Sequence, residues 1–212
     1  MKIIAINGSP RKTWNTHTLL EKALEGAREA GAETELINLY DINFKGCTSC
    51  FACKRKGSSL NKCAMKDDLE PILQKISECD GLVLGSPIYY TSITGEMASF
   101  LERLFFPYGS YELKPSSFGR KINTAFIYTM NAPSFALPLI GYNKTFKYYK
   151  KQMKYTFGAS EYLVVTSTYQ FEDYSKYSIT VFSGEKRLKR REEVFPKDCE
   201  KAFLLGKRLC QN

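Results

Sequence analysis

The sequence has one histidine and one tryptophan among 212 residues, and it has no long apolar run. A membrane-spanning helix needs about 20 consecutive apolar residues, and no stretch of the chain approaches that length. The apolar run of residues 1–6 is too short for the core of a signal peptide. We therefore predict a cytoplasmic protein without a membrane partner. The single histidine, His17, has no identified partner, which favours a structural role over catalysis.

Two common nucleotide-binding loops are missing. The chain contains neither a Walker sequence ending in Gly-Lys-Ser/Thr nor a Gly-x-Gly-x-x-Gly sequence. Acidic residues number 22 against 31 lysines and arginines, and the net charge of +9 favours anionic ligands. The basic run of residues 186–191 also permits a nucleic-acid partner. We interpret it as a solvated segment and predict no nucleic-acid binding, because no recognition helix or base-reading aromatic set accompanies it.

The chain alternates apolar runs with helical patterns. Strands are predicted at residues 3–6, 34–39, 81–85, 123–129 and 162–166. Helices are predicted from a stripe at residues 19–27, from a start at residues 67–70, and at residues 95–106, 146–157 and 197–209. This alternation predicts an α/β fold in which helices cover both faces of a parallel sheet. We expect one domain over residues 1–212, with a cysteine-containing insertion at about 44–66 and an irregular segment at about 169–193.

The turn after the first predicted strand suits a phosphate. It joins a buried strand to a helix, and the start of a helix offers unpaired N–H groups and a partial positive charge. Ser9, Asn15 and Thr16 add short polar donors, and Arg11 adds a charged fork. An ordinary capped turn would explain Asn15 or Thr16 but gives no reason for Arg11.

This loop carries a family resemblance. Gly8-Ser9-Pro10-Arg11-Lys12 and Asn15-Thr16 resemble the phosphate loop of the NADPH-dependent FMN reductase and iron–sulfur flavoprotein group. The chain departs from that pattern at Trp14, where glycine is common. The resemblance implies a flavodoxin-like fold, which is a doubly wound five-stranded parallel sheet of order 2-1-3-4-5, and it implies FMN as cofactor.

Two further loops follow from the same resemblance. In this strand order the ligand crevice lies between strands one and three, so the loops at residues 8–16 and 86–95 are expected to face each other. The family's second loop wraps the flavin ring, and a third loop follows strand four. The residues that match are Pro87, Ile88, Tyr89, Tyr90, Ser92 and Gly95 in the second loop, and by position alone Thr129 and Asn131 in the third.

Four of the seven cysteines form a compact group. Cys47, Cys50 and Cys53 have two consecutive two-residue gaps, and Cys63 follows after nine residues. Structural zinc usually takes two separated pairs, so this spacing favours an iron–sulfur cluster over zinc. Iron–sulfur flavoproteins carry a similar motif with a shorter last gap. A [4Fe-4S] cluster, zinc, a reversible disulfide and free thiols all stay open. We interpret the other cysteines, Cys79, Cys199 and Cys210, as small buried hydrophobes.

The resemblance implies an FMN-dependent oxidoreductase, and it alone indicates NADPH or NADH as the electron donor. The electrons would pass to a small-molecule or protein acceptor, with the cluster as a possible intermediate carrier. Relatives are commonly homodimers or homotetramers. Two alternatives are a non-enzymatic flavodoxin-like electron carrier and a basic binding module that senses redox state or metal through its cysteines.

Overall fold

The computed structural model describes residues 1–57, 59–112 and 116–211. Its centre is a five-stranded parallel sheet in the order β2-β1-β3-β4-β5, as the resemblance implied. The strands are β1 (Lys2–Asn7), β2 (Glu33–Asn38), β3 (Gly81–Pro87), β4 (Ile122–Thr129) and β5 (Gly158–Val165). The flavodoxin-like fold class is therefore confirmed.

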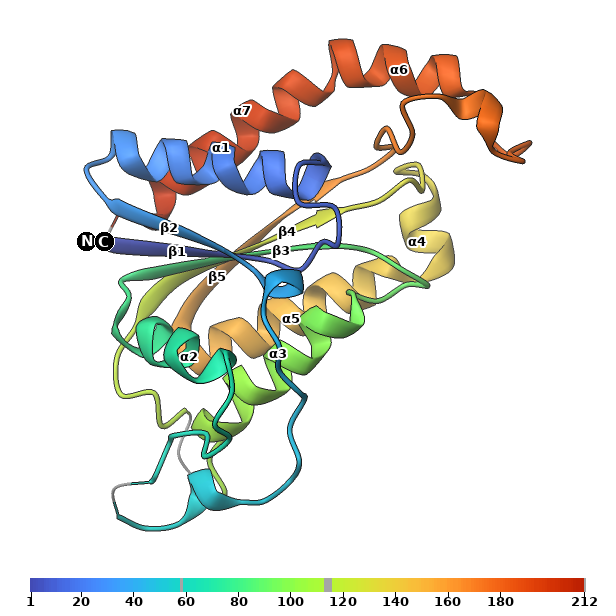
Figure 1. The fold of residues 1–212 in the computed structure, drawn as a ribbon. Coiled ribbons are helices and arrows are strands. Elements are labelled where there is room, and N and C mark those ends of the chain that lie inside the picture. Colours follow the sequence, from blue (N-terminus) through green and yellow to red (C-terminus); the bar gives the residue numbers. More distant parts are fainter. Residues whose placement is uncertain (58, 113–115, 212) are drawn as a thin grey trace.

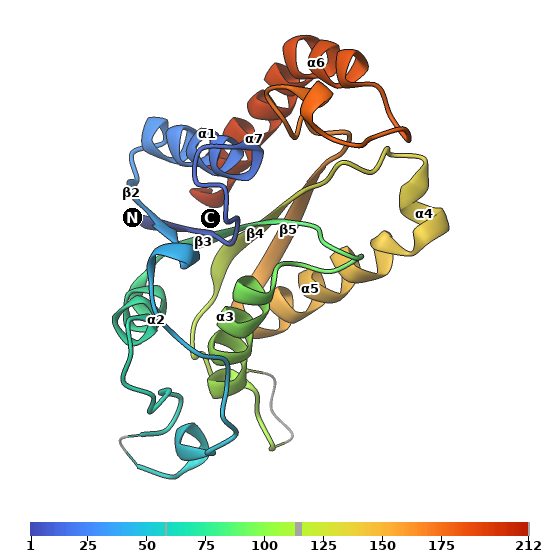
Figure 2. The ribbon, with the colours of Figure 1, turned by 45° about the vertical axis from the view of Figure 1, so that its right-hand side comes forward.

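Helices cover both faces of the sheet (Figure 1). Helices α1 (Asn15–Glu29) and α7 (Phe195–Leu209) pack on one face, and α2 (Leu69–Glu78), α3 (Gly95–Phe105) and α5 (Tyr142–Phe157) pack on the other. Two further helices, α4 (Ala136–Ile140) and α6 (Gly184–Glu193), lie near the end where β4 and β5 finish (Figure 2). The 3-10 helices are η1 (Leu39–Asp41), η2 (Ala52–Lys54), η3 (Phe106–Tyr108) and η4 (Tyr174–Lys176).

The alternation of side chains along β1 explains why two helical layers are needed. Ile3 and Ala5 belong to the core against α1 and α7, whereas Ile4 and Ile6 belong to the core against α2, α3 and α5. All four side chains are fully buried. A strand buried on both faces reads as a continuous apolar run, which is why this element was predicted to within a residue.

The structure differs from prediction where the apolar pattern is weak. Helix α5 begins at Tyr142 instead of Phe146, and β5 begins at Gly158 instead of Tyr162. Strand β5 lies at the sheet edge and most of its residues are only half-buried, so pairing with β4 defines its start better than apolarity does. Helix α4 was not predicted, since it has only five residues.

The segment 169–193 was predicted to be irregular, and this is wrong for its second half. Residues 184–193 form α6, which Ser183 caps by accepting a hydrogen bond from the N–H of Lys186. None of the α6 residues is fully buried, so its sequence has no apolar stripe that could reveal a helix. Within the described ranges, no helix is both long and apolar enough to cross a membrane.

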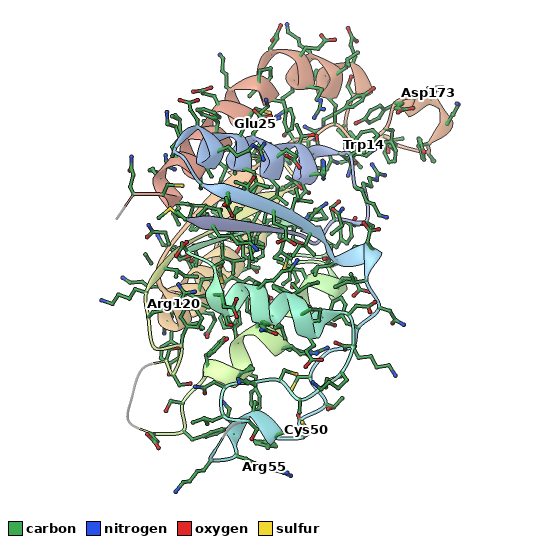
Figure 3. The ribbon with its side chains drawn as sticks, turned by 60° about the vertical axis from the view of Figure 1, so that its left-hand side comes forward. Trp14, Glu25, Cys50, Arg55, Arg120 and Asp173 are labelled. Carbon is green, nitrogen blue, oxygen red and sulfur yellow. The ribbon has the colours of Figure 1, made fainter. Side chains whose placement is uncertain are left out.

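The cysteine-containing segment lies apart from the strand ends. Residues 44–66 run beneath α2 and α3, with η2 as their one regular element among those described. Figure 3 shows Cys50 near the lower end of the molecule and Trp14 in its upper part, well apart. The two features that the sequence singled out, the phosphate-type loop and the cysteine group, therefore belong to separate regions of the chain.

Candidate functional site

The loops after β1 and β3 are bonded directly to each other. The hydroxyl of Thr94 donates to the carbonyl of Gly8 at 2.7 Å, and the N–H of Gly8 donates to the carbonyl of Gly85 at 2.8 Å. Thr94 also caps α3, because its hydroxyl accepts from the N–H of Met97. The sequence placed these loops opposite one another but gave no sign of the role of Thr94. Thr94 is buried, and its hydroxyl fixes the spacing between the two loops.

The loop after β4 joins the same assembly. The hydroxyls of Thr16 and Thr129 lie 2.8 Å apart, and both residues are buried. The N–H of Ile88 donates to the carbonyl of Thr129 at 2.9 Å. Three strand-end loops thus meet at the carboxyl edge of the sheet, where strand order reverses between β1 and β3.

The first loop is wound around Ser9. This residue is buried, its N–H donates to the Asn7 side-chain oxygen at 3.0 Å, and its hydroxyl accepts from the N–H of Arg11 at 3.2 Å. The N-cap of α1 is Trp14, and it makes no side-chain capping bond. No side chain therefore competes at the N-cap with an anion for the first N–H groups of the helix.

The side chain of Asn15, predicted as a donor to the phosphate, is bonded within the protein. Its amide nitrogen donates to the carbonyl of Tyr169 at 2.8 Å, and its amide oxygen accepts from the guanidinium of Arg191 at 2.8 Å. The side-chain amide is thus held from both sides by the C-terminal part of the chain. It holds the start of α1 in place, and in this arrangement it is not a free donor.

Arg11 also turns toward the C-terminal segment. Its guanidinium donates to the carbonyl of Gln170 and lies over the rings of Trp14 and Phe171, at 5.1 and 5.6 Å from their centroids. Trp14 stacks on Tyr169 with centroids 6.3 Å apart, on the side of the molecule where Figure 3 shows Asp173. The indole thus packs against the segment that follows β5.

The basic run is not simply solvated, so that interpretation is wrong for three of its residues. Arg187 donates to the carbonyl of Asn131 at 2.9 Å, Arg191 holds Asn15, and Arg190 pairs with Asp198. Burial lowers the pKa of both Arg187 and Arg191, which nevertheless stay charged at neutral pH. Their spacing of four residues puts both on one helix face.

The second loop presents aromatic rings at the edge of the assembly. Tyr89 and Ser92 exchange backbone hydrogen bonds of 2.8 and 3.0 Å around a tight turn. Tyr90 and Thr91 take left-handed backbone conformations there, with φ of 46° and 68°, at a cost of about 1 kcal/mol each. The Tyr90 side chain is fully exposed and that of Tyr89 about half exposed, so both rings are accessible.

The four grouped cysteines share one pocket. Cys47, Cys50, Cys53 and Cys63 line it together with Phe51, Phe106 and Arg103. All four thiols are unbridged, and burial raises the pKa of Cys53. Among the described residues, no three His, Cys, Asp or Glu side chains lie close enough together to hold a metal ion. The four cysteines of this pocket match, in number and kind, the ligands that a thiolate-bound metal centre takes.

The prediction of small buried hydrophobes is confirmed for Cys79 and holds only in part for Cys199 and Cys210. Cys79 is fully buried in the core, and burial raises the pKa of its thiol to about 11. Cys199 and Cys210 are half-buried and pack against the core between α1 and α7. None of the three joins the cysteine pocket.

The carboxylate of Asp67 pairs with the buried Arg103 at 2.9 Å, and the pH dependence of stability can test this ion pair. Burial opposes ionisation of Asp67, but the hydrogen bonds and charge of Arg103 prevail and hold its pKa below the ordinary value. Asp67→Asn should therefore lower the free energy of unfolding by about 2 kcal/mol at pH 7. A depressed pKa stabilises above the unfolded value of about 3.9, so the deficit should shrink toward zero as the pH falls through the folded pKa.

Urea unfolding at pH 7 and pH 3 measures this difference. The matched control is Asp68→Asn, because Asp68 is the exposed neighbour and makes no bond to Arg103. It should stay within about 0.5 kcal/mol of the wild type. A deficit for Asp67→Asn that is equally large at both pH values would contradict the assigned ion pair.

The chain is similar in sequence to known proteins. A sequence model of the family described as NADPH-dependent FMN reductase matches residues 1–129. An iron–sulfur flavoprotein of Methanocaldococcus jannaschii is 41% identical over 103 residues, covering 49% of this chain and 51% of the relative. One from Archaeoglobus fulgidus is 33% identical over 122 residues, covering 58% and 53%. The match thus spans about half the length of these curated relatives.

Solved structures support the fold. An NAD(P)H:quinone oxidoreductase from Methanothermobacter marburgensis superposes with a TM-score of 0.73 at 14% identity, covering 100% of this chain and 98% of that one. An FMN-dependent NADH-azoreductase from Bacillus anthracis, solved with FMN, gives 0.66 at 13% identity and full coverage of both chains. Because the family match covers residues 1–129 of 212, the protein belongs to the NADPH-dependent FMN reductase family, as the resemblance of its loops indicated.

Proposed function

We propose that the protein is an FMN-dependent oxidoreductase that binds one FMN at the carboxyl edge of its sheet. The observation that carries this proposal is the bonding of three strand-end loops, through Thr94 to Gly8 and through Thr16 to Thr129. Doubly wound sheets bind ligands at such a reversal of strand order, and family membership supports FMN as that ligand.

The phosphate end would lie against the first loop. The first N–H groups of α1 supply donors, and the partial positive charge of the helix start favours a dianion. The hydroxyls of Ser9 and Thr16 hold the loop in shape through their bonds to Arg11 and Thr129. Arg191, held at Asn15, adds a full positive charge close behind that helix start. The charge of Arg191 takes the place that the sequence assigned to Arg11, because the guanidinium of Arg11 donates to the carbonyl of Gln170.

The ring end would lie against residues 87–90 and the loop after β4. The side-chain oxygen of Asn131 is buried and has no hydrogen-bond partner among the described residues. An unpaired buried acceptor is costly, and it suits a ligand that brings an N–H group, as the oxidised flavin ring does. Tyr89 and Tyr90, in the second loop, offer exposed aromatic surface. When bound, FMN supplies hydride and single-electron chemistry, and the protein supplies position and electrostatics.

The electron donor in this proposal is NADPH or NADH, and the acceptor is a small molecule or a protein. Family membership supports the donor class. Steady-state oxidation of each nucleotide, with and without a quinone acceptor, tests the enzymatic role. A protein that binds FMN tightly yet oxidises neither nucleotide would instead be a flavodoxin-like carrier.

The cysteine pocket would hold a [4Fe-4S] cluster through Cys47, Cys50, Cys53 and Cys63. The support is that all four thiols line one pocket beside a buried cation, and that the named relatives are iron–sulfur flavoproteins. A cluster adds single-electron storage to the flavin chemistry. Iron, sulfide and zinc analysis of anaerobically purified protein distinguishes a cluster from zinc and from free thiols.

A homodimer or homotetramer is part of the same proposal. Helix α4 and the residue before it expose large apolar side chains, with Phe135 at 73% and Leu139 at 81%, and Tyr90 in the second loop is fully exposed. Apolar side chains gathered in this way are typical of surfaces that bind protein. Sedimentation at several protein concentrations measures the assembly.

Thr16→Val tests the cofactor site. The change keeps the side-chain shape but removes the hydroxyl that bonds to Thr129, so the FMN affinity should fall about tenfold, equivalent to about 1.4 kcal/mol. Quenching of FMN fluorescence during titration of apo-protein measures the affinity. Thr34→Val is the control, because Thr34 lies on β2 and its hydroxyl bonds only to Arg28 among the described residues. Equal affinities for the two variants would count against the proposed site.

A further inference from the structure

A buried cation forms part of the wall of the cysteine pocket. Arg103, on α3, has a fully buried side chain and lines the pocket together with all four cysteines. A buried arginine is costly unless it is paired and hydrogen-bonded, so its position calls for a physical reason. Neither the family match nor the sequence pattern assigned it a role.

We propose that Arg103 is a positioning residue for the metal centre of the four cysteines: it fixes both ends of their segment and supplies a buried positive charge that favours an anionic, thiolate-bound centre. For a [4Fe-4S] cluster, this charge raises the reduction potential. The inference rests on the proposed function for the identity of the cluster, whereas its electrostatic part holds for any thiolate-bound metal.

The hydrogen bonds of Arg103 show how it holds the segment. One guanidinium nitrogen, Nη1, donates to the carbonyl of Lys45 at 3.1 Å, just before the first cysteine. The other, Nη2, donates to the carbonyl of Met65 at 3.4 Å, just after the last. Both nitrogens also bond to the carboxylate of Asp67. A single side chain on a rigid helix therefore ties together the entry and the exit of the cysteine segment.

One donor of Arg103 is left over. Its Nε is buried and has no hydrogen-bond partner among the described residues. An unpaired buried donor costs about 1–3 kcal/mol, more for a charged group, so a partner is expected when the site is complete. Since Arg103 lines the pocket of the four thiols, sulfur carried by a bound centre is the acceptor that the geometry offers.

The charge of Arg103 matters more than that of the cations around it. Arg55 and Lys56 are exposed, so water and salt screen them from the pocket. Lys54 is directed to the carbonyls of Pro107 and Gly109. Of the nearby acids, Glu102 accepts from the N–H of Cys47 at 2.9 Å, and Asp67 partly neutralises Arg103. The reduced cluster carries one more negative charge than the oxidised one, so a buried cation favours reduction.

Three variants around this ion pair test the proposal. Arg103→Gln removes the charge, and Arg103→Lys keeps the charge but loses the pair of guanidinium nitrogens that bond to Asp67. Asp67→Asn removes the negative charge that partly neutralises Arg103. The matched control, Arg55→Gln, makes the same charge change at the exposed tip of the segment, close to Cys50 in Figure 3. The readout is the midpoint potential of the cluster in FMN-loaded protein, followed by electron paramagnetic resonance in a redox titration.

Opposite shifts are expected for the two sides of the ion pair. Arg103→Gln should lower the reduction equilibrium constant about tenfold, which is ~59 mV for one electron, and Asp67→Asn should raise it. Arg103→Lys and Arg55→Gln should stay near the wild type. A shift of equal sign for Arg103→Gln and Asp67→Asn would mean structural damage, and this result overturns the proposal. If Arg103→Gln does not fold, the potentials of Asp67→Asn and Arg103→Lys decide.

A second measurement separates this inference from the proposed cluster. Apo-protein is titrated with Co²⁺ alone, and thiolate-to-cobalt absorption gives the affinity. Arg103→Gln should bind Co²⁺ about tenfold more weakly than wild type and Arg55→Gln equally well, because the metal bound to four thiolates is still an anion. If the wild type takes up no iron–sulfur cluster but still binds Co²⁺ more tightly than Arg103→Gln does, the cluster is refuted and the role of Arg103 is supported. Equal Co²⁺ affinities for Arg103→Gln and wild type overturn that role.

Discussion

Gly206→Ala is expected to lower the free energy of unfolding by about 3 kcal/mol, because two helix backbones meet at this glycine. A methyl group at Gly206 would lie 1.7 Å from the carbonyl oxygen of Ala23 on α1. The contact is reciprocal, since a methyl at Gly26 on α1 would lie 2.0 Å from the carbonyl oxygen of Phe203 on α7. Backbone atoms cannot swing aside as a side chain can, so α1 and α7 must separate. Urea unfolding of the apo-protein measures the loss.

The control for that change is Gly95→Ala. Gly95 begins α3, and a methyl group there would meet nothing within 4 Å. Alanine favours helix over glycine by up to about 1 kcal/mol, so this variant should be as stable as the wild type or more stable. A loss below about 1 kcal/mol for Gly206→Ala would show that α7 packs less closely on α1 than the structure has it.

The fold was predictable where local pattern and final burial agree. Strands β1 and β3 are buried on both faces, and their apolar runs are continuous in the sequence. Helix α6 was missed because tertiary contacts hold it, through Arg191 to Asn15 and Arg190 to Asp198. Such contacts leave no apolar stripe in a sequence, so periodicity could not find the helix.

The site residues, too, were predictable only where the signal is local in the sequence. Ser9 and Thr16 were identified because they lie within a few residues of a strand-to-helix turn, where the chemistry is local. The contact of Arg191 with Asn15 spans 176 residues, and no short motif encodes it. Arg103 was missed for a related reason, since its partners Lys45 and Met65 lie 58 and 38 residues away in the sequence, at the two ends of the cysteine segment. Pairs that are distant in sequence require the fold to be known first.

Gly8→Ala is expected to weaken FMN binding about 100-fold, equivalent to about 2.8 kcal/mol. A methyl group at Gly8 would lie 2.9 Å from the Cβ of Met97 and 3.3 Å from the carbonyl oxygen of Gly85. The end of the Met97 side chain can move, but its Cβ and the β3 backbone cannot. The first loop would therefore shift away from α3 and strain the Thr94 bond that joins the two loops.

Fluorescence titration with FMN measures this effect, and urea unfolding of the same apo-protein separates it from damage to the fold. Overpacking should cost about 1–3 kcal/mol of stability, which leaves most of the protein folded at pH 7. Gly109→Ala is the matched control, because a methyl there makes only ordinary contacts of 3.7 Å or more. Normal FMN affinity in folded Gly8→Ala protein would place the phosphate elsewhere. If Gly8→Ala binds FMN weakly and Gly109→Ala binds it normally, then FMN binding depends on the loop after β1 lying close against α3.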